Sequence, residues 1–75
     1  MATLQERYAD ALLERAIERS HLTPDFMDRI ERSLATSDQL AQYVAILIAH
    51  VERFAYPSGQ IMNRISRILE RVAAA

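Results

Sequence analysis

Hydrophobic positions recur every three or four residues along this 75-residue chain, and no stretch alternates between polar and apolar residues as a strand would. The period predicts α-helices throughout. Residues that start and stop helices delimit four of them, joined by short connections. We therefore expect an all-α fold in a single domain, residues 1–75, built as a compact bundle of four short helices.

The first two helices are marked at their start by threonine. Thr3 opens a capping box with Glu6, in which each side chain bonds to the backbone amide of the other residue, and the helix is predicted to run to about Ser20. Thr23 precedes a proline and an acidic residue, which is a common beginning of a helix. This second helix is predicted to end near Ala35.

The last two helices are marked by a cap and by a helix-stopping segment. Residues 36–39, Thr-Ser-Asp-Gln, supply a fresh N-cap, so a third helix is predicted from there to about Ala55. One long, bent helix in place of the second and third is the alternative. Residues 57–59, Pro-Ser-Gly, stop the third helix, and Ser58 is placed to cap a fourth over about residues 59–73.

The helices differ in how much apolar surface they carry. At about 100° per residue, the apolar residues of the fourth helix fall in one arc of about 120°, which predicts one buried face. The second helix is similar. The members of the two faces are Ile61, Met62, Ile65, Ile68, Leu69 and Val72 on the fourth helix, and Phe26, Met27, Ile30 and Leu34 on the second.

The third helix is apolar nearly all round, which predicts a central element that its neighbours cover on most sides. Its main stripe is widened by Ala41, Ala45 and Ile48, while Ile46 points elsewhere. The stripe itself consists of Leu40, Val44, Leu47, Val51 and Phe54.

The first helix has more apolar surface than one face holds. Leu4, Tyr8, Leu12 and Ala16 form the stripe expected to pack inside the chain, and Ala9, Leu13 and Ile17 continue beyond it. A ladder of acidic residues, Glu6, Asp10, Glu14 and Glu18, runs beside them. An apolar face bordered by charges of one sign is typical of a helix–helix interface, whereas single exposed apolar residues are the alternative.

This surplus predicts a homodimer, because two-fold pairing is the commonest way to cover such a patch. Leu13 and Ile17 are expected near the middle of the interface. Antiparallel pairing would set the acidic ladder of one copy against Arg15 and Arg19 of the other. The predicted interface residues are Ala9, Leu13, Ile17, Glu14, Arg15 and Glu18. A larger protein that docks on the same surface is the other partner considered.

Composition leaves little room for catalysis. Cysteine is absent, so disulfides, thiolate metal sites and cysteine nucleophiles are excluded together. The chain has two histidines, His21 and His50. Glu52 follows His50 by two residues, which does not place two metal ligands on one face of a helix, and His50 is expected to be partly buried. A single Gly cannot build a phosphate loop. We expect no cofactor, no metal, no small-molecule substrate and no enzymatic activity.

Nucleic-acid binding is the alternative function. Residues 1–38 hold five Arg and eight acids, net −3, whereas residues 39–75 hold four Arg and two acids, net +2. A helix-turn-helix-like regulator would use residues 58–73, with Gln60, Asn63, Arg64, Arg67 and Arg71 facing DNA. The long preceding helix and the net charge of −1 for the whole chain argue against it.

The longest apolar run, residues 44–49, is far shorter than the roughly 20 residues that span a membrane. The amino terminus lacks the pattern of a secretory signal, so a cytoplasmic protein with no membrane partner is expected. Taken with the missing catalytic groups, these features predict a small non-enzymatic interaction or regulatory module that acts through a helical surface.

Overall fold

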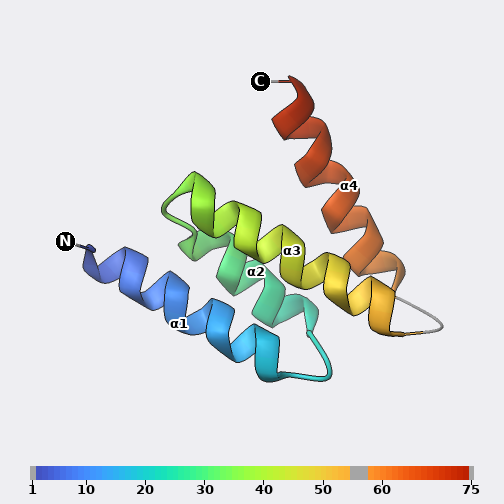
Figure 1. Ribbon diagram of the computed structural model, residues 1–75, viewed down its shortest axis with the longest axis horizontal. Helices are drawn as coiled ribbons and strands as arrows, with labels where there is room; N and C mark the ends of the chain where they lie inside the picture. Colours follow the sequence, from blue (N-terminus) through green and yellow to red (C-terminus); the bar gives the residue numbers. More distant parts are fainter. Residues whose placement is uncertain (1, 55–57, 75) are drawn as a thin grey trace. The chain divides into compact units, whose positions relative to one another are not determined.

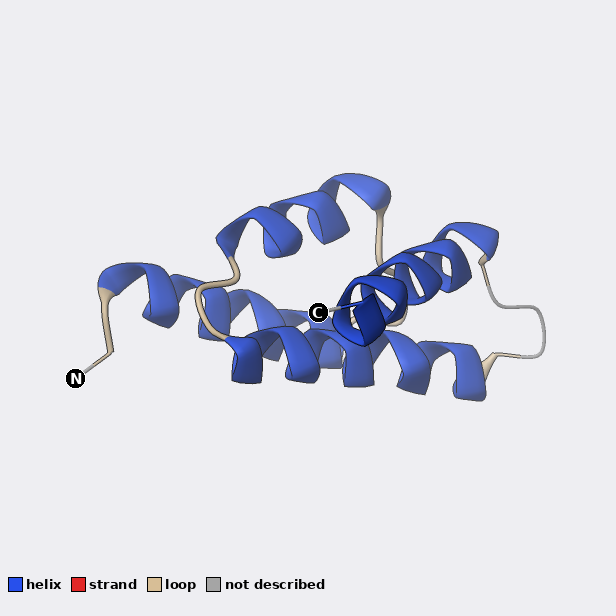
Figure 2. Ribbon diagram, turned by 90° about the horizontal axis from the view of Figure 1, so that it is seen from above, coloured by secondary structure: helices blue, strands red, loops and turns tan. Residues whose placement is uncertain are grey.

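The computed structural model describes residues 2–54 and 58–74, the last two by their backbone alone. These residues form four α-helices and no strand (Figure 1 and Figure 2). In chain order the helices are α1 (Leu4–Glu18), α2 (Pro24–Ser33), α3 (Ser37–Arg53) and α4 (Gly59–Ala74). The all-α class and the four helices predicted from the sequence are confirmed.

Every helix begins at the hydroxyl side chain that the sequence marked as its cap. In each case the side-chain oxygen accepts a hydrogen bond from a backbone amide of the first turn, over 3.1–3.2 Å. The caps and their donors are Thr3 with Glu6, Thr23 with Phe26, Thr36 with Gln39, and Ser58 with Gln60. The cap at Thr36 confirms that α2 and α3 are separate helices.

The ends of the helices are less well predicted than their starts. α1 stops at Glu18 and α2 at Ser33, each two residues before its predicted end. The third helix stops at Arg53; Ala55 and Pro57, on which its predicted end rested, lie outside the described residues. Helix ends lack a side-chain signal as sharp as a hydroxyl cap when no glycine follows, and the one glycine of the chain, Gly59, is the first residue of α4.

Tertiary packing divides the chain into two compact units, Met1–Tyr43 and Val44–Ala75. The boundary falls inside α3, although the helix itself is continuous. Unit 1 therefore contains α1, α2 and the first turns of α3. Unit 2 contains the remaining turns of α3 together with α4. The organisation of residues 1–75 as one domain stays a prediction.

In unit 1, α1 packs against α2 through small and aliphatic side chains. α1 buries a compact face at positions i, i+3, i+4 and i+7, which lie on one side of a helix. α2 contributes Met27 and Ile30, and Leu22 between the helices is buried as well. The buried face of α1 consists of Ala9, Leu12, Leu13 and Ala16.

The stripe predicted for α1 is therefore half wrong, because Leu4 and Tyr8 are exposed. Steps of four residues advance about 400° around a helix, so each step drifts about 40° from the one before. Leu4 and Leu12 consequently lie about 80° apart. A run of i, i+4 residues winds around the helix, and only its second half, Leu12 and Ala16, reaches the packed face.

A buried glutamine joins the start of α3 to α1. The Gln39 amide nitrogen donates to the Glu6 carbonyl oxygen over 2.9 Å and to Asp10 Oδ1 over 2.8 Å. Its amide oxygen accepts from the backbone nitrogen of Ala35, over 2.9 Å, just before α3 begins. One side chain thus uses both amide hydrogens and its oxygen, and it fixes the entry of α3 against α1.

Tyr43, one turn further along α3, makes the corresponding link to α2. Its ring is fully buried, and its hydroxyl donates to the carboxylate of Glu31 on α2. A buried tyrosine is stable when its hydroxyl finds a partner, and here a charged acceptor supplies one. In unit 1, Gln39 and Tyr43 therefore tie α3 to both other helices.

The expectation that α3 is covered on most sides is wrong. Ala41, Ala45 and Ile48 share one side of the helix, and all three are exposed. The buried side carries Ile46, Tyr43 and two polar residues, Gln39 and His50, which an apolar pattern overlooks. Its members are Gln39, Tyr43, Val44, Ile46, Leu47 and His50. α3 is thus an amphipathic helix. Its buried arc is centred nearer to Tyr43 and Ile46 than the sequence predicted, and further from Ala41 and Ala45.

Replacing Gln39 tests whether its hydrogen bonds hold unit 1 together. Gln39→Ala is expected to lower the free energy of unfolding by about 1–3 kcal/mol, because shielded backbone groups lose their partners. Gln42→Ala removes the same side chain from the exposed side of α3 and is expected to change it by less than about 0.5 kcal/mol. Urea unfolding followed by circular dichroism measures both. Equal stability of the two variants would contradict the role of Gln39.

Candidate interaction surface

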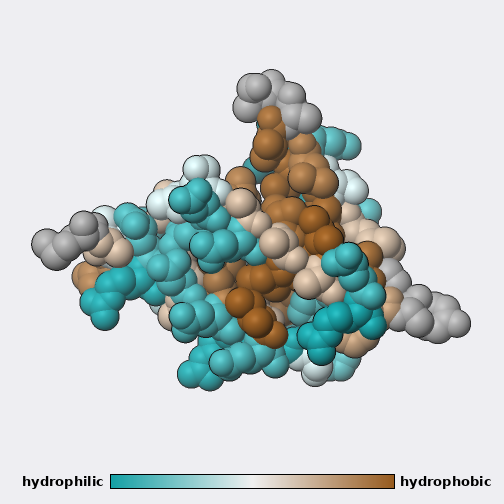
Figure 3. Space-filling model, viewed as in Figure 1, coloured by the Kyte–Doolittle hydropathy of each residue, from teal (hydrophilic) through white to brown (hydrophobic). Residues whose placement is uncertain are grey.

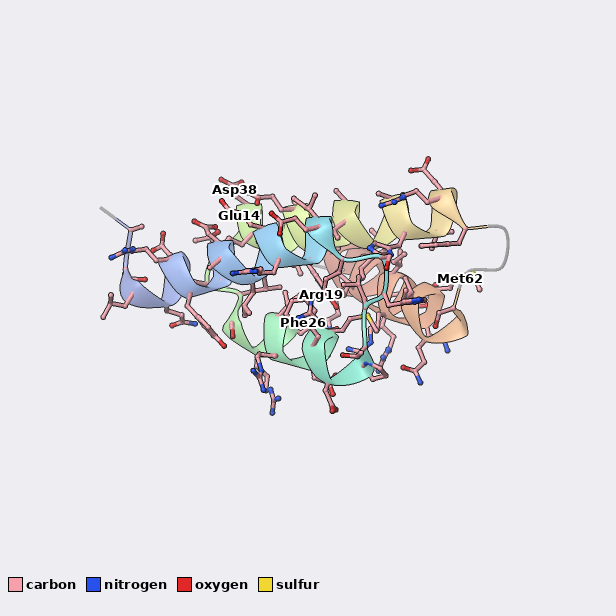
Figure 4. All side chains as sticks on the ribbon, turned by 90° about the horizontal axis from the view of Figure 1, so that it is seen from below. Glu14, Arg19, Phe26, Asp38 and Met62 are labelled. Atoms are coloured by element: carbon pink, nitrogen blue, oxygen red, sulfur yellow. The ribbon has the colours of Figure 1, made fainter. Side chains whose placement is uncertain are left out.

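The helix α4 exposes a run of large apolar side chains along one side. Its cap at Ser58 fixes where the helix starts, and the apolar residues from Ile61 to Val72 then share one side of the helix. Figure 3 shows these hydrophobic residues gathered along α4, and Figure 4 labels Met62 near the start of the helix. The sequence predicted this face to be buried.

The structure leaves much of the face uncovered. Only Ile61, in the first turn, is buried, while Ile65 and Ile68 are half-buried. The exposed fractions are 42% for Met62, 49% for Leu69 and 58% for Val72. Within unit 2, the ribbons of α3 and α4 diverge from the connection between them (Figure 1), so only the start of α4 can gain cover from its neighbour. The predicted buried face of α4 is thus largely wrong.

Four residues form the line along which this face is open: Met62, Ile65, Leu69 and Val72, called here the α4 seam. They are spaced by three, four and three residues. This is the spacing of a helix that packs against another helix along its length. The geometry of the α4 seam therefore suits an α-helical partner better than a flat or irregular surface.

The opposite side of α4 carries the residues predicted for the nucleic-acid alternative. Gln60, Asn63, Arg67 and Arg71 are exposed, and Arg64 is half-buried. The structure thus brings these residues onto one side of one helix, as predicted. The connection from Arg53 to Gly59 is longer than the turn of three or four residues in a helix-turn-helix, and α3 spans 17 residues. The arrangement departs from that motif.

The interface predicted on α1 is corrected by the burial of its centre. Leu13 is 2% exposed and Ala9 is fully buried, so both already belong to the packed face of α1. Ile17 is 62% exposed, and Glu14, Arg15 and Glu18 are exposed around it. Ile17 is therefore one isolated apolar side chain among charged residues. The packed face of α1 includes Leu13 and leaves out Leu4.

Arg19 has a contact within its own chain. Its guanidinium carbon lies 4.3 Å from the centre of the Phe26 ring (Figure 4). This cation–π contact links the residue after α1 to the first turn of α2. The expected pairing of Arg19 with the acidic ladder of a second copy left out the aromatic ring seven residues along the chain.

His50 is buried more deeply than predicted. Among the described residues, no partner for its Nε2 atom is within hydrogen-bond distance. Its ring lies 5.8 Å from the ring of Phe54, centre to centre. In the same part of the chain, no three His, Cys, Asp or Glu side chains gather as a metal site requires.

No helix among the described residues combines the length and hydrophobicity that crossing a membrane would need. Comparison of the chain with protein-family models, with curated proteins and with solved structures found no match.

Paired alanine substitutions on α1 test where its packed face lies. Leu13→Ala is expected to destabilise the protein by about 2–5 kcal/mol, because it leaves a cavity in unit 1. Ile17→Ala removes a side chain of the same size from an exposed position and is expected to cost less than about 0.5 kcal/mol. Thermal unfolding measures the difference. If Ile17→Ala destabilised the protein more than Leu13→Ala, the packed face of α1 would lie on the side of Ile17, and the assignment given above would be wrong.

Proposed function

We propose that this chain is a small non-enzymatic interaction module that binds another polypeptide through the α4 seam. The exposure of Met62, Leu69 and Val72 on one side of a single helix is the observation that carries the proposal. Apolar side chains scattered singly are ordinary on a protein surface. A continuous line of them along a helix is typical of a site where a second helix packs.

The energetics favour a partner for this surface. Full burial of a Val, Leu or Met side chain contributes about 1.5–3 kcal/mol, so covering three that are about half exposed contributes about 2–4 kcal/mol from this side of the interface alone. A domain of this size has a net stability of only about 5–10 kcal/mol. Leaving the seam in water therefore forgoes a substantial fraction of what the chain could gain.

The residues available elsewhere support a binding role over a catalytic one. The composition provides no cysteine nucleophile and only two histidines as general bases near neutral pH. The polar side of α4 could contact phosphates through Arg67 and Arg71. With a net charge of −1 and an acidic first half, however, the chain lacks the electrostatic attraction on which such binding mainly depends.

A photoreactive residue on the seam tests this function in living cells. Leu69 is replaced by p-benzoylphenylalanine in the full chain, and Arg67 is replaced in the same way as a control on the opposite side of α4. We expect irradiation to attach a polypeptide at position 69 and none at position 67. Adding Val72→Glu should abolish the adduct, because a charge in the seam opposes helix packing.

Two results would contradict the proposal. One is the absence of any polypeptide adduct at position 69. The other is a nucleic-acid adduct at position 67 that survives Val72→Glu, which would instead support a DNA-binding regulator that uses the polar side of α4.

A further inference from the structure

We infer that the partner of the α4 seam is the α4 seam of a second copy of this chain. This inference rests on the proposed function and names its partner. It places the homodimer interface on α4 and not on α1, where Leu13 and Ala9 are buried. The reasons are the spacing of the seam, the absence of charge beside it, and the small charge of the whole chain.

The spacing of the seam is self-complementary. Met62 and Leu69 are seven residues apart, and so are Ile65 and Val72. These are the two core positions of a heptad, in which each side chain inserts between four residues of the facing helix. When a two-fold axis relates two such helices, the seam residues of each copy insert between the seam residues of the other.

Charge beside the seam would oppose self-pairing, and the positions that border it are neutral. Ile61 and Ile68 lie on one side of the seam, and Ser66 lies on the other. The charged residues of α4 are further round the helix, more than about 100° from the centre of the seam: Arg64, Arg67, Glu70 and Arg71. Two copies can therefore meet without placing like charges against each other, which costs affinity wherever it occurs.

The same neutral border makes other partners less fitting. A strongly acidic partner helix would need cations beside the seam to choose it, because charges in those positions determine which helices pair. A lipid surface attracts amphipathic helices with basic residues along the polar–apolar boundary, yet Arg67 is opposite the seam. The net charge of −1 gives no attraction to anionic lipid and little repulsion between copies.

The length of the seam determines how strong the pairing is. From Met62 to Val72 the helix rises about 15 Å, or roughly three turns. Contact over such a length buries less than about 1,200 Å², which is typical of weak and reversible association. We therefore expect a dimer that forms in the micromolar range and not an obligate one.

Sedimentation equilibrium of the purified full chain tests the inference. The wild type is expected to be mainly dimeric at about 300 µM and mainly monomeric at about 1 µM. Leu69→Glu should raise the dissociation constant about a hundredfold, since it brings an unpaired charge into the dry interface. Asn63→Glu adds the same charge on the other side of α4 and should leave the dissociation constant unchanged.

A second variant and a measurement of helix content distinguish the loss of the interface from the loss of the fold. Val72→Glu, at a more exposed seam position, should act like Leu69→Glu, and circular dichroism should show wild-type helix content in both. A dimer that persists in both folded variants would place the interface elsewhere and overturn the inference.

A wild type that stays monomeric at about 300 µM also overturns it. The proposed function survives that result if position 69 still attaches a different polypeptide in cells. Cosedimentation of the monomer with vesicles of phosphatidylglycerol, lost in Leu69→Glu, would instead identify a lipid surface as the partner and reject both proposals.

Discussion

The geometry of unit 1 depends on one buried amide group. Gln39 bonds at once to the backbone of α1, to a carboxylate of α1 and to the backbone that precedes α3. Apolar packing between α1 and α2 is tolerant in angle and offset, whereas hydrogen bonds to three groups fix both. The side chain therefore determines where α3 starts relative to α1, and with it the position of Tyr43 against α2.

The sequence predicted well those features that depend on residues within one turn of helix, above all the helix starts. Hydroxyl caps specify a start through a bond between neighbours in the chain, so Thr3, Thr23, Thr36 and Ser58 could all be assigned without knowledge of the fold. The role of Gln39 was also within reach in part, because a glutamine three residues after a threonine cap is the capping-box pattern. Its bonds to α1 depend on tertiary structure and left no trace in the sequence.

The burial of side chains was predicted less well, because it depends on which other helices pack against an apolar helix face. Leu13 and Leu69 both stand on apolar faces, yet one is packed and the other is open. Hydrophobic periodicity reports that a helix has an apolar side, and it does not say whether that side meets its own chain. The exposed face of α4 was consequently predicted to be part of the core. The interface predicted on α1, in contrast, included Ala9 and Leu13, which belong to the core.

The locally capped helices have a further consequence for how quickly the chain folds. Each helix can begin from a bond that spans two or three residues, and in unit 1 α1 packs against the helix that follows it directly. Chains dominated by contacts between near neighbours lose little entropy before those contacts form, and helical proteins of this kind fold in microseconds to milliseconds. Unit 1, in which α1 packs against the next helix along the chain, is therefore expected to fold within that time.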